Sequence, residues 1–359
     1  MTNNPYKQLA ERLDATPNAF PPTDDGAELR LLEKIFTPEE AELASQLRLV
    51  METPAQIVER IGGEVEETTK RLKGMRRKGL VEYERREEGR FFGLMVFAIG
   101  FWENQMPTMD AELAHLFEDY YQKGIGKAIT MSPSIHRVIP VGESIRTDME
   151  VEPYESAIEI VNSAKAWAIW DCICRKQQAL IGEPCEHPVD NCMVFSQSPG
   201  VFDRSQIFTA ITREESLATL QKAAEDGLVH SVNNHQGDMT YICNCCTCAC
   251  GILRGMVDLG LANVVARSAF VNKVDEDLCT GCELCLDHCQ FEALSMVEKF
   301  VEVDEARCVG CGVCVLSCQD EALTLVRRPE DEIMPVPVTH ADWQVERAAA
   351  RGIELNEVM

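Results

Sequence analysis

Apolar residues in the N-terminal third of the chain recur with the spacing of amphipathic helices, and the pattern then changes to alternation. Leu31, Leu32 and Ile35 fall on one helical face. The pairs Thr37-Pro38 and Thr53-Pro54 each place a capping hydroxyl before a proline, which is typical of a helix start. The pattern predicts helices over 5–14, from Pro38, over Thr53–Ile61 and over Glu64–Lys78, followed by strands over Leu80–Arg85 and Arg90–Met95.

Helices followed by a hairpin give the order of a winged helix-turn-helix domain within residues 29–105, and Thr53–Leu94 resembles bacterial winged-helix regulators. The third helix of such a domain reads DNA with its N-terminal residues, but here it begins with Glu64, Glu66 and Glu67. We therefore expect this domain to dock on protein, and binding to nucleic acid is disfavoured. Residues 1–28 are expected to form an N-terminal arm and a linker.

Residues 106–268 are expected to form a cysteine-rich α+β middle domain, in which Asn233–Gly237 turns a hairpin that ends at Cys243. Helices are expected over Met109–Lys123, Pro153–Ala168, Glu214–Glu225 and Gly251–Leu261. The tail, residues 329–359, is predicted to end in a short amphipathic helix that serves as a docking arm or a frayed end. The expected fold class is therefore a multidomain α+β protein.

Net charge and hydropathy limit the classes of function that the chain can have. The chain of 359 residues has 34 basic and 59 acidic side chains, a formal net charge of −25. A chain this acidic binds nucleic acid poorly, because phosphate must be neutralised by a basic face. The longest apolar run, Phe91–Trp102, is shorter than the ~20 residues that a bilayer span needs, and no secretory signal is recognisable. We therefore expect a cytoplasmic protein without a membrane span.

All 17 cysteines lie between Cys172 and Cys318. Clustered cysteines in a chain without an export signal indicate metal rather than disulfide bonds. The last eight form two copies of C-x2-C-x2-C-x3-C, and each copy is preceded by Val-Asp-Glu and followed by Glu-Ala-Leu. The repeated flanks indicate that the two copies form one pseudo-twofold unit.

The spacing of these eight cysteines is typical of two [4Fe–4S] clusters. Three thiolates on a tight loop bind three irons, and the fourth ligand comes from the distal cysteine of the other copy. Gly281 and Gly310 stand inside the loops, where the backbone must turn tightly. The alternative is a pair of zinc knuckles, but zinc would not need three closely spaced cysteines in each copy. The predicted ligands are Cys279, Cys282, Cys285 and Cys318 for cluster 1, and Cys308, Cys311, Cys314 and Cys289 for cluster 2.

Residues 270–328 resemble the bacterial two-cluster ferredoxin domain, and this resemblance implies electron transfer. The chain departs from that family after each distal cysteine, where Gln290 and Gln319 replace the usual proline. Glutamine can donate a hydrogen bond that proline cannot. Because hydrogen bonds tune cluster potentials, the resemblance alone does not fix the potentials of these two clusters at the family's low values.

The other nine cysteines occupy two short segments: Cys172, Cys174, Cys185 and Cys192, then Cys243, Cys245, Cys246, Cys248 and Cys250. They fit at least one further Fe–S cluster, a zinc site, or free redox-active thiols. The spacing allows two four-ligand sites with one cysteine left over, or a single site drawn from both segments. Arg175 could offset the charge of a cluster, and a helix beginning at Gly251 could direct N–H groups toward it.

The whole order, with the Cys172–Arg175 and Ile242–Cys246 segments in the middle, resembles the large 4Fe–4S ferredoxin-type proteins of anaerobic bacteria and archaea. This resemblance implies an electron carrier, or the electron-transfer subunit of a larger oxidoreductase, that acts with a redox partner protein. Two alternatives remain open. One is a redox- or oxygen-responsive winged-helix regulator. The other is an oxidoreductase with a site cluster at the middle cysteines, where Arg175 and His187 are the nearest polar groups.

Overall fold

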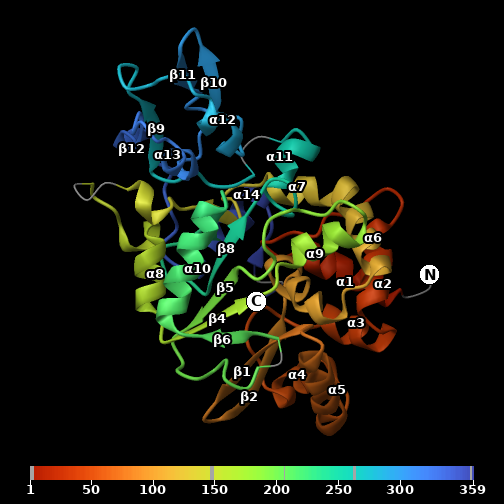
Figure 1. Ribbon diagram of the computed structural model, residues 1–359. Coiled ribbons are helices and arrows are strands. Elements are labelled where there is room, and N and C mark those ends of the chain that lie inside the picture. The colour runs from red at the N-terminus through yellow and green to blue at the C-terminus, as the bar shows by residue number, and fades with distance from the viewer. Residues whose placement is uncertain (1–3, 146–148, 206, 262–263, 356–357) are drawn as a thin grey trace. The chain divides into compact units, whose positions relative to one another are not determined.

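The computed structural model describes residues 4–145, 149–205, 207–261, 264–355 and 358–359 (Figure 1). The chain forms two compact units. The first contains Met1–Ser132, Gln177–Pro184 and Gln344–Met359, and the second contains Pro133–Lys176 and Cys185–Trp343. Helices α9 (Ile173–Leu180) and α14 (His340–Arg351) contribute residues to both units.

The first unit is mainly helical, and its helices begin where the sequence predicts. The Thr37 and Thr53 hydroxyls each accept the backbone N–H three residues on, so both helix starts have a capping box. Strands β1 and β2 pair as an antiparallel hairpin. The elements are α1 (Pro5–Asp14), α2 (Ala27–Ile35), α3 (Pro38–Ser45), α4 (Pro54–Ile61), α5 (Val65–Arg77), β1 (Val81–Arg86), β2 (Gly89–Leu94), η1 (Phe97–Phe101), η2 (Glu103–Thr108), α6 (Ala111–Tyr120), η3 (Tyr121–Ile125) and α7 (Gly126–Ile129).

Aromatic side chains form the centre of the first unit. Trp102 stacks on Phe117 with ring centroids 4.0 Å apart, and Phe20 meets Phe97 edge to face at 5.0 Å. Burial of rings this large is a main source of stability in a core. Because Phe20 is buried, the proline-containing segment between α1 and α2 is packed against the core.

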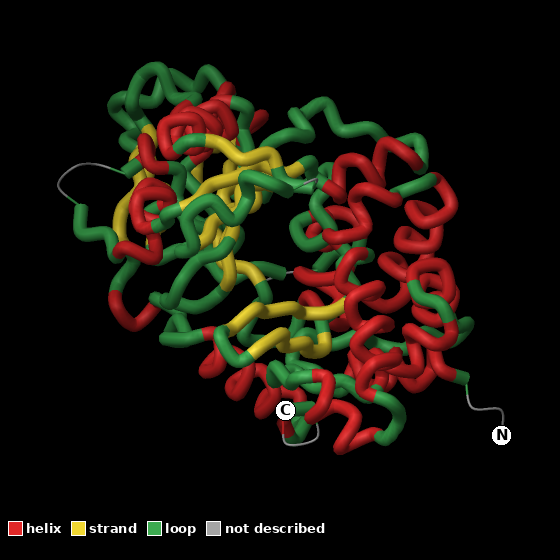
Figure 2. Tube along the Cα trace, turned by 90° about the horizontal axis from the view of Figure 1, so that it is seen from below, coloured by secondary structure: helices red, strands yellow, loops and turns green. Residues whose placement is uncertain are grey.

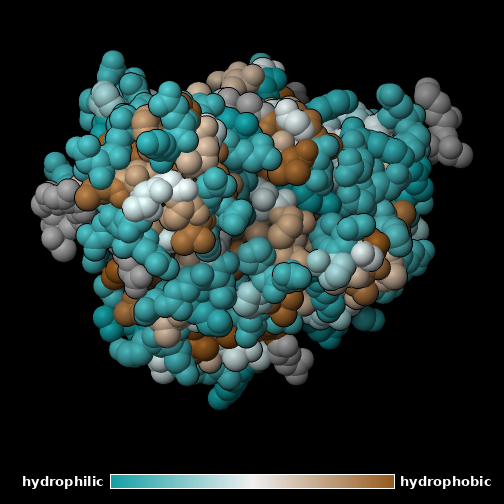
Figure 3. Space-filling view, turned by 45° about the horizontal axis from the view of Figure 1, so that its top comes forward, coloured by the Kyte–Doolittle hydropathy of each residue, from teal (hydrophilic) through white to brown (hydrophobic). Residues whose placement is uncertain are grey.

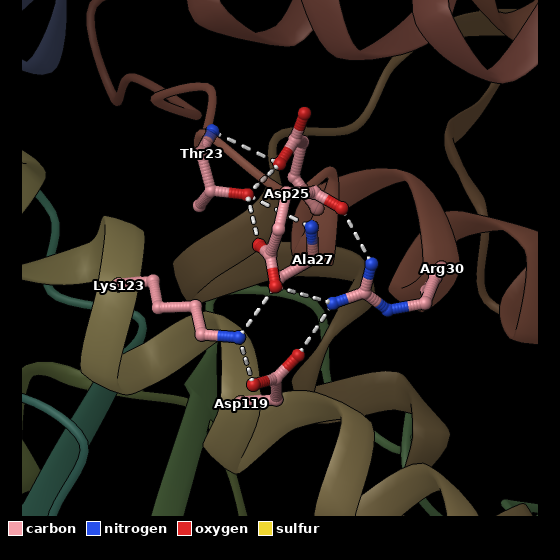
Figure 4. Close-up of polar contacts among 7 residues, drawn as sticks. Thr23, Asp25, Ala27, Arg30, Asp119 and Lys123 are labelled. Carbon is pink, nitrogen blue, oxygen red and sulfur yellow. Dashed lines mark hydrogen bonds and ion pairs between the residues drawn. The ribbon is translucent and has the colours of Figure 1, made fainter.

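A network of ion pairs fixes the end of the same segment (Figure 4). The carboxylate of Asp25 accepts hydrogen bonds from Arg30 at 3.1 Å and from Lys123 at 2.7 Å, and Asp119 binds the same two cations. The hydrogen bond from Lys123 is the main reason that the pKa of Asp25 lies below its usual value. Asp25 and Lys123 are exposed and Arg30 and Asp119 are half-buried, so water screens the ion pairs and the network defines the geometry more than it adds stability.

The C-terminal tail is packed on the first unit, so the frayed end, one of the two forms expected for it, is wrong. Arg347, on α14, is fully buried. Burial lowers its pKa to about 10, so the guanidinium stays charged at neutral pH. It donates to three backbone carbonyls, those of Pro17 at 2.8 Å, Met131 at 2.6 Å and Ala128 at 2.6 Å. These bonds join three segments that are distant in sequence, which explains why an arginine occupies a core position.

Replacing Arg347 with methionine should therefore destabilise the first unit by about 3 kcal/mol, because three buried carbonyls lose their donors. The measurement is urea unfolding followed by far-ultraviolet circular dichroism. Arg85→Met, at an exposed position of the same unit, is the matched control and should change stability little. Equal unfolding midpoints for the two variants would contradict the expectation.

The second unit is built around a six-stranded antiparallel sheet of order β3-β7-β8-β5-β4-β6. Strands are drawn in yellow in Figure 2. Helices α8 and α10 pack on it, and Ile160, Leu220 and Ile242 are among the residues of the core between them. The elements up to the sheet's last strand are β3 (His136–Val138), η4 (Gly142–Ser144), η5 (Pro153–Glu155), α8 (Ala157–Ser163), β4 (Ala166–Trp170), β5 (Cys192–Ser196), β6 (Thr209–Ile211), α10 (Arg213–Glu225), β7 (Val229–Asn233) and β8 (Tyr241–Cys245).

Two predicted helices of this unit are wrong in extent. The helix expected over Pro153–Ala168 is divided into the short η5 and α8, and the residues that follow α8 form strand β4. The helix expected from Gly251 is the short α11, which begins at Arg254. By contrast, α10 matches the helix expected over Glu214–Glu225 closely.

The C-terminal segment of the second unit repeats one pattern of short elements. It contains α11 (Arg254–Asp258), β9 (Phe270–Val274), α12 (Leu284–His288), β10 (Leu294–Val297), β11 (Phe300–Val303), α13 (Val313–Leu316), β12 (Leu323–Arg327) and η6 (Glu330–Glu332). Strand β9 pairs with β12, and β10 pairs with β11. The outer pairing joins the start of the first repeat to the end of the second, so the two repeats form one unit.

Hydrophilic residues cover most of the face in Figure 3, and apolar residues form scattered groups on it. Among the helices of the described ranges, none is long and apolar enough to cross a membrane.

Candidate metal centres

Each C-terminal cysteine loop begins at an aspartate that shapes the turn. The carboxylate of Asp275 accepts the N–H groups of Asp277 and Leu278, and Asp304 does the same for Ala306 and Arg307. Such bonds from an aspartate to N–H groups two and three residues on stabilise a tight turn. The repeated Val-Asp-Glu flank therefore marks the start of each loop.

Two glycines allow the loops to close. Gly281 and Gly310 both have a φ of 69°, in the left-handed region. A Cβ at Gly281 would lie 2.6 Å from the carbonyl oxygen of Lys299, and one at Gly310 would lie 2.1 Å from that of Phe270. Any other residue would therefore clash with backbone at these positions.

The loops surround two cavities, and each cavity takes cysteines from both repeats. Cavity 1 is lined by Cys279, Cys282, Cys285 and Cys318. Cavity 2 is lined by Cys289, Cys308, Cys311 and Cys314. The structure thus brings the distal cysteine of each repeat to the loop of the other, which is the grouping that the spacing predicts.

The two cavities differ in their surroundings. The amide of Asn272, which lines cavity 2, donates to the sulfur of Cys314 at 3.2 Å. In cavity 1 the lining includes the apolar Val301, and the cysteine Cys282 is exposed. A hydrogen bond to a ligand sulfur and a change in exposure both shift the potential of an Fe–S cluster. The two cavities would therefore give unequal potentials.

Burial also controls the protonation of these thiols. It raises the pKa of Cys285 to about 11 and that of Cys311 to about 12. As free thiols they would be protonated at neutral pH. Metal ligands must be thiolates, so metal binding here has to release protons.

The nine middle cysteines separate into two groups. In the first group, which we call the Cys3His group, Cys185, Cys246 and Cys248 meet His187. The Cys185 sulfur lies 3.0 Å from that of Cys248, 3.6 Å from that of Cys246 and 3.1 Å from Nδ1 of His187. All four donor atoms lie within 4.8 Å of one another, and no other such group is this close among the residues that the structure describes.

The other six middle cysteines form a ring of thiol contacts, which we call the six-cysteine ring. The thiol of Cys172 contacts those of Cys174 and Cys192, Cys250 contacts Cys174 and Cys245, and Cys243 contacts Cys192 and Cys245. The backbone N–H of Gly251 points to the Cys174 sulfur at 3.5 Å. The turn after Cys250 therefore directs an N–H group at sulfur without the helix start that the sequence predicted.

Arg175 lies between the two groups and is buried. Its guanidinium donates to the carbonyl of Asn244 at 2.9 Å, the side chain of Asn191 at 2.7 Å and the Cys246 sulfur at 3.5 Å. Burial disfavours its charge, but the thiolates of Cys172 and Cys246 outweigh that effect and raise its pKa. Arg175 therefore places a permanent positive charge beside both groups of sulfurs.

His187 was not predicted to be a metal ligand. The signal that could have identified it is the Cys185-x-His187 spacing, which places two donors on one short loop. The sequence left open two sets of four cysteines or a single site drawn from both segments. The structure groups three cysteines from both segments with the histidine and leaves the other six together.

Comparison with known proteins bears on the C-terminal segment. No curated protein matches the chain. The family model described as "4Fe-4S binding domain" matches twice, at residues 272–295 and 301–324. These matches contain both cysteine runs, so the C-terminal part of the chain is a ferredoxin-type 4Fe–4S domain with two repeats.

Proposed function

We propose that this protein is an iron–sulfur electron carrier, or the electron-transfer subunit of a larger anaerobic oxidoreductase. The observation that carries the proposal is the pair of cavities, each lined by three cysteines of one repeat and the distal cysteine of the other. This arrangement fits two [4Fe–4S] clusters with exchanged ligands. The two family-model matches support the same cofactors.

The six-cysteine ring supports a further iron–sulfur centre in the middle domain. Six thiols exceed the four ligands of a mononuclear tetrahedral site, so the ring fits a polynuclear centre. Cys172, Cys245 and Cys250 are buried, which would shield such a centre from water. Together with the two ferredoxin clusters it would provide a third site for electrons.

Cluster 1 is the proposed exit to the redox partner. Cys282 is exposed there, and Leu278 and Leu284 next to the loop are 49% and 43% exposed. Glu283 and Asp320 line the same cavity. An apolar contact with an acidic rim suits a partner protein that presents a basic face.

The first unit would serve docking rather than catalysis. Helices α4 and α5 followed by the β1–β2 hairpin support a winged-helix-like domain within residues 29–105. The first turn of α5 contains Glu66 and Glu67, which would repel DNA phosphate. We therefore propose a protein partner for this domain as well, in a cytoplasmic setting.

The experiment is anaerobic purification followed by iron and sulfide analysis and reversible reduction. We expect more than about 8 iron atoms per chain, with two four-iron clusters in the C-terminal domain. Dithionite should produce the electron paramagnetic resonance signal of two interacting reduced clusters, and a mild oxidant of higher potential should reoxidise them. Clusters that are present but cannot be cycled would overturn the electron-transfer role.

A further inference from the structure

The Cys3His group has the dimensions of a mononuclear metal site. A tetrahedral zinc ion with Zn–S bonds of about 2.3 Å keeps its sulfur ligands about 3.8 Å apart. The Cys185 sulfur lies 3.6 Å from that of Cys246 and 3.0 Å from that of Cys248. Nδ1 of His187 lies 3.1 Å from the first and 3.7 Å from the last of these sulfurs. The donors therefore surround a volume for one ion.

The same dimensions disfavour a [4Fe–4S] cluster at this group. A cubane binds each ligand at a different iron, so its ligands stand around a cluster rather than around a single ion. The cysteines of the C-terminal domain show that arrangement, since each set of four lines a cavity. Three thiolates and one imidazole are typical of a closed structural zinc site.

We propose that Cys185, His187, Cys246 and Cys248 bind one zinc ion, and that this ion holds the Cys246–Cys248 loop in place against the ferredoxin domain. The buried guanidinium of Arg175, 3.5 Å from the Cys246 sulfur, offsets part of the charge that three thiolates leave. The zinc ion would join two chain segments that are distant in sequence, the loop after α9 and the turn after β8.

The contact with the ferredoxin domain runs through Gln290. Its side-chain oxygen accepts the backbone N–H of Thr247 at 2.7 Å, and its side-chain nitrogen donates to the carbonyl of Gly227. Thr247 stands between two zinc ligands, and Gln290 follows Cys289, which lines cavity 2. The equivalent Gln319 of the second repeat is exposed. Gln290 therefore has a specific structural use in this chain, which proline could not fulfil because it has no side-chain donor or acceptor.

The proposal is tested by metal analysis of the full chain, grown with zinc and purified without oxygen. We expect one zinc ion per chain, and zinc X-ray absorption should give three sulfur ligands at about 2.3 Å and one nitrogen at about 2.0 Å. His187→Ala should lose the zinc and keep its iron. His187→Cys should retain zinc, because a thiolate replaces the imidazole. His288→Ala, at an exposed histidine, is the matched control and should keep the full metal content.

Three results would overturn the proposal: no zinc in the wild-type chain, four sulfur ligands around the zinc, or unchanged zinc in His187→Ala. The absorption measurement uses the wild-type protein, so it does not depend on a variant that folds. Zinc binding also does not depend on electron transfer. A chain that binds zinc but cannot cycle its clusters would refute the proposed function alone.

Discussion

Replacing Cys318 with alanine should empty cavity 1, although its other three cysteines belong to the first repeat. The Cys318 sulfur lines that cavity with Cys279, Cys282 and Cys285. Alanine is preferred to serine because a serine oxygen can still bind iron. The expected loss is about four irons per chain. A domain of about 60 residues also has too small a core to remain stable without its clusters, so the melting temperature should fall as well.

Pairs of variants test the exchange of ligands directly. Cys282→Ala and Cys318→Ala should remove the same resonance signal, and their combination should lose no more iron than either alone. Cys282→Ala combined with Cys289→Ala should remove both clusters, because these residues line different cavities. Non-additivity is the signature of residues that act in one site. If Cys282 and Cys289 were instead the non-additive pair, each repeat would hold its own cluster.

The C-terminal domain was predictable because its signals are local and repeated. The Asp275 and Asp304 turns, the two glycines and the cysteine spacing all lie within short stretches of chain. The helices of the first unit were predictable for a similar reason, since Thr37 and Thr53 cap within three residues. Local chemistry determines these features wherever the rest of the chain lies.

The grouping of the middle cysteines was not predictable, because it depends on sheet pairing. The β5–β8 register places Met193 opposite Ile242, and this brings Cys192 beside Cys243. The β7–β8 hairpin of the sheet was expected. The rest of the sheet was missed because β3 and β6 have three residues each and β4 continues an apolar stretch that also suits a helix. The register between strands that are distant in sequence cannot be read from the spacing of residues within one segment.

The six-cysteine ring should behave as one centre in a second set of variants. Cys172→Ala and Cys245→Ala lie in different cysteine segments, yet both belong to the ring. Each should remove the iron that exceeds the two ferredoxin clusters, and the double variant should lose no more. Cys248→Ala is the control from the neighbouring group, and it should lose zinc but keep this iron. Iron and zinc analysis with resonance spectra of the purified chains provides the measurement.

The alternative is that each cysteine segment binds its own metal, and it makes the opposite prediction. Each single variant would then lose part of the excess iron, and the double variant would lose the sum. Thiols that have lost their metal react with oxygen when solvent reaches them. Both single variants should therefore form sulfenic acids or disulfides in air. Wild-type protein that contains no iron beyond the two ferredoxin clusters would show that the contacts among these thiols do not hold iron. The route for electrons would then end at the two ferredoxin clusters.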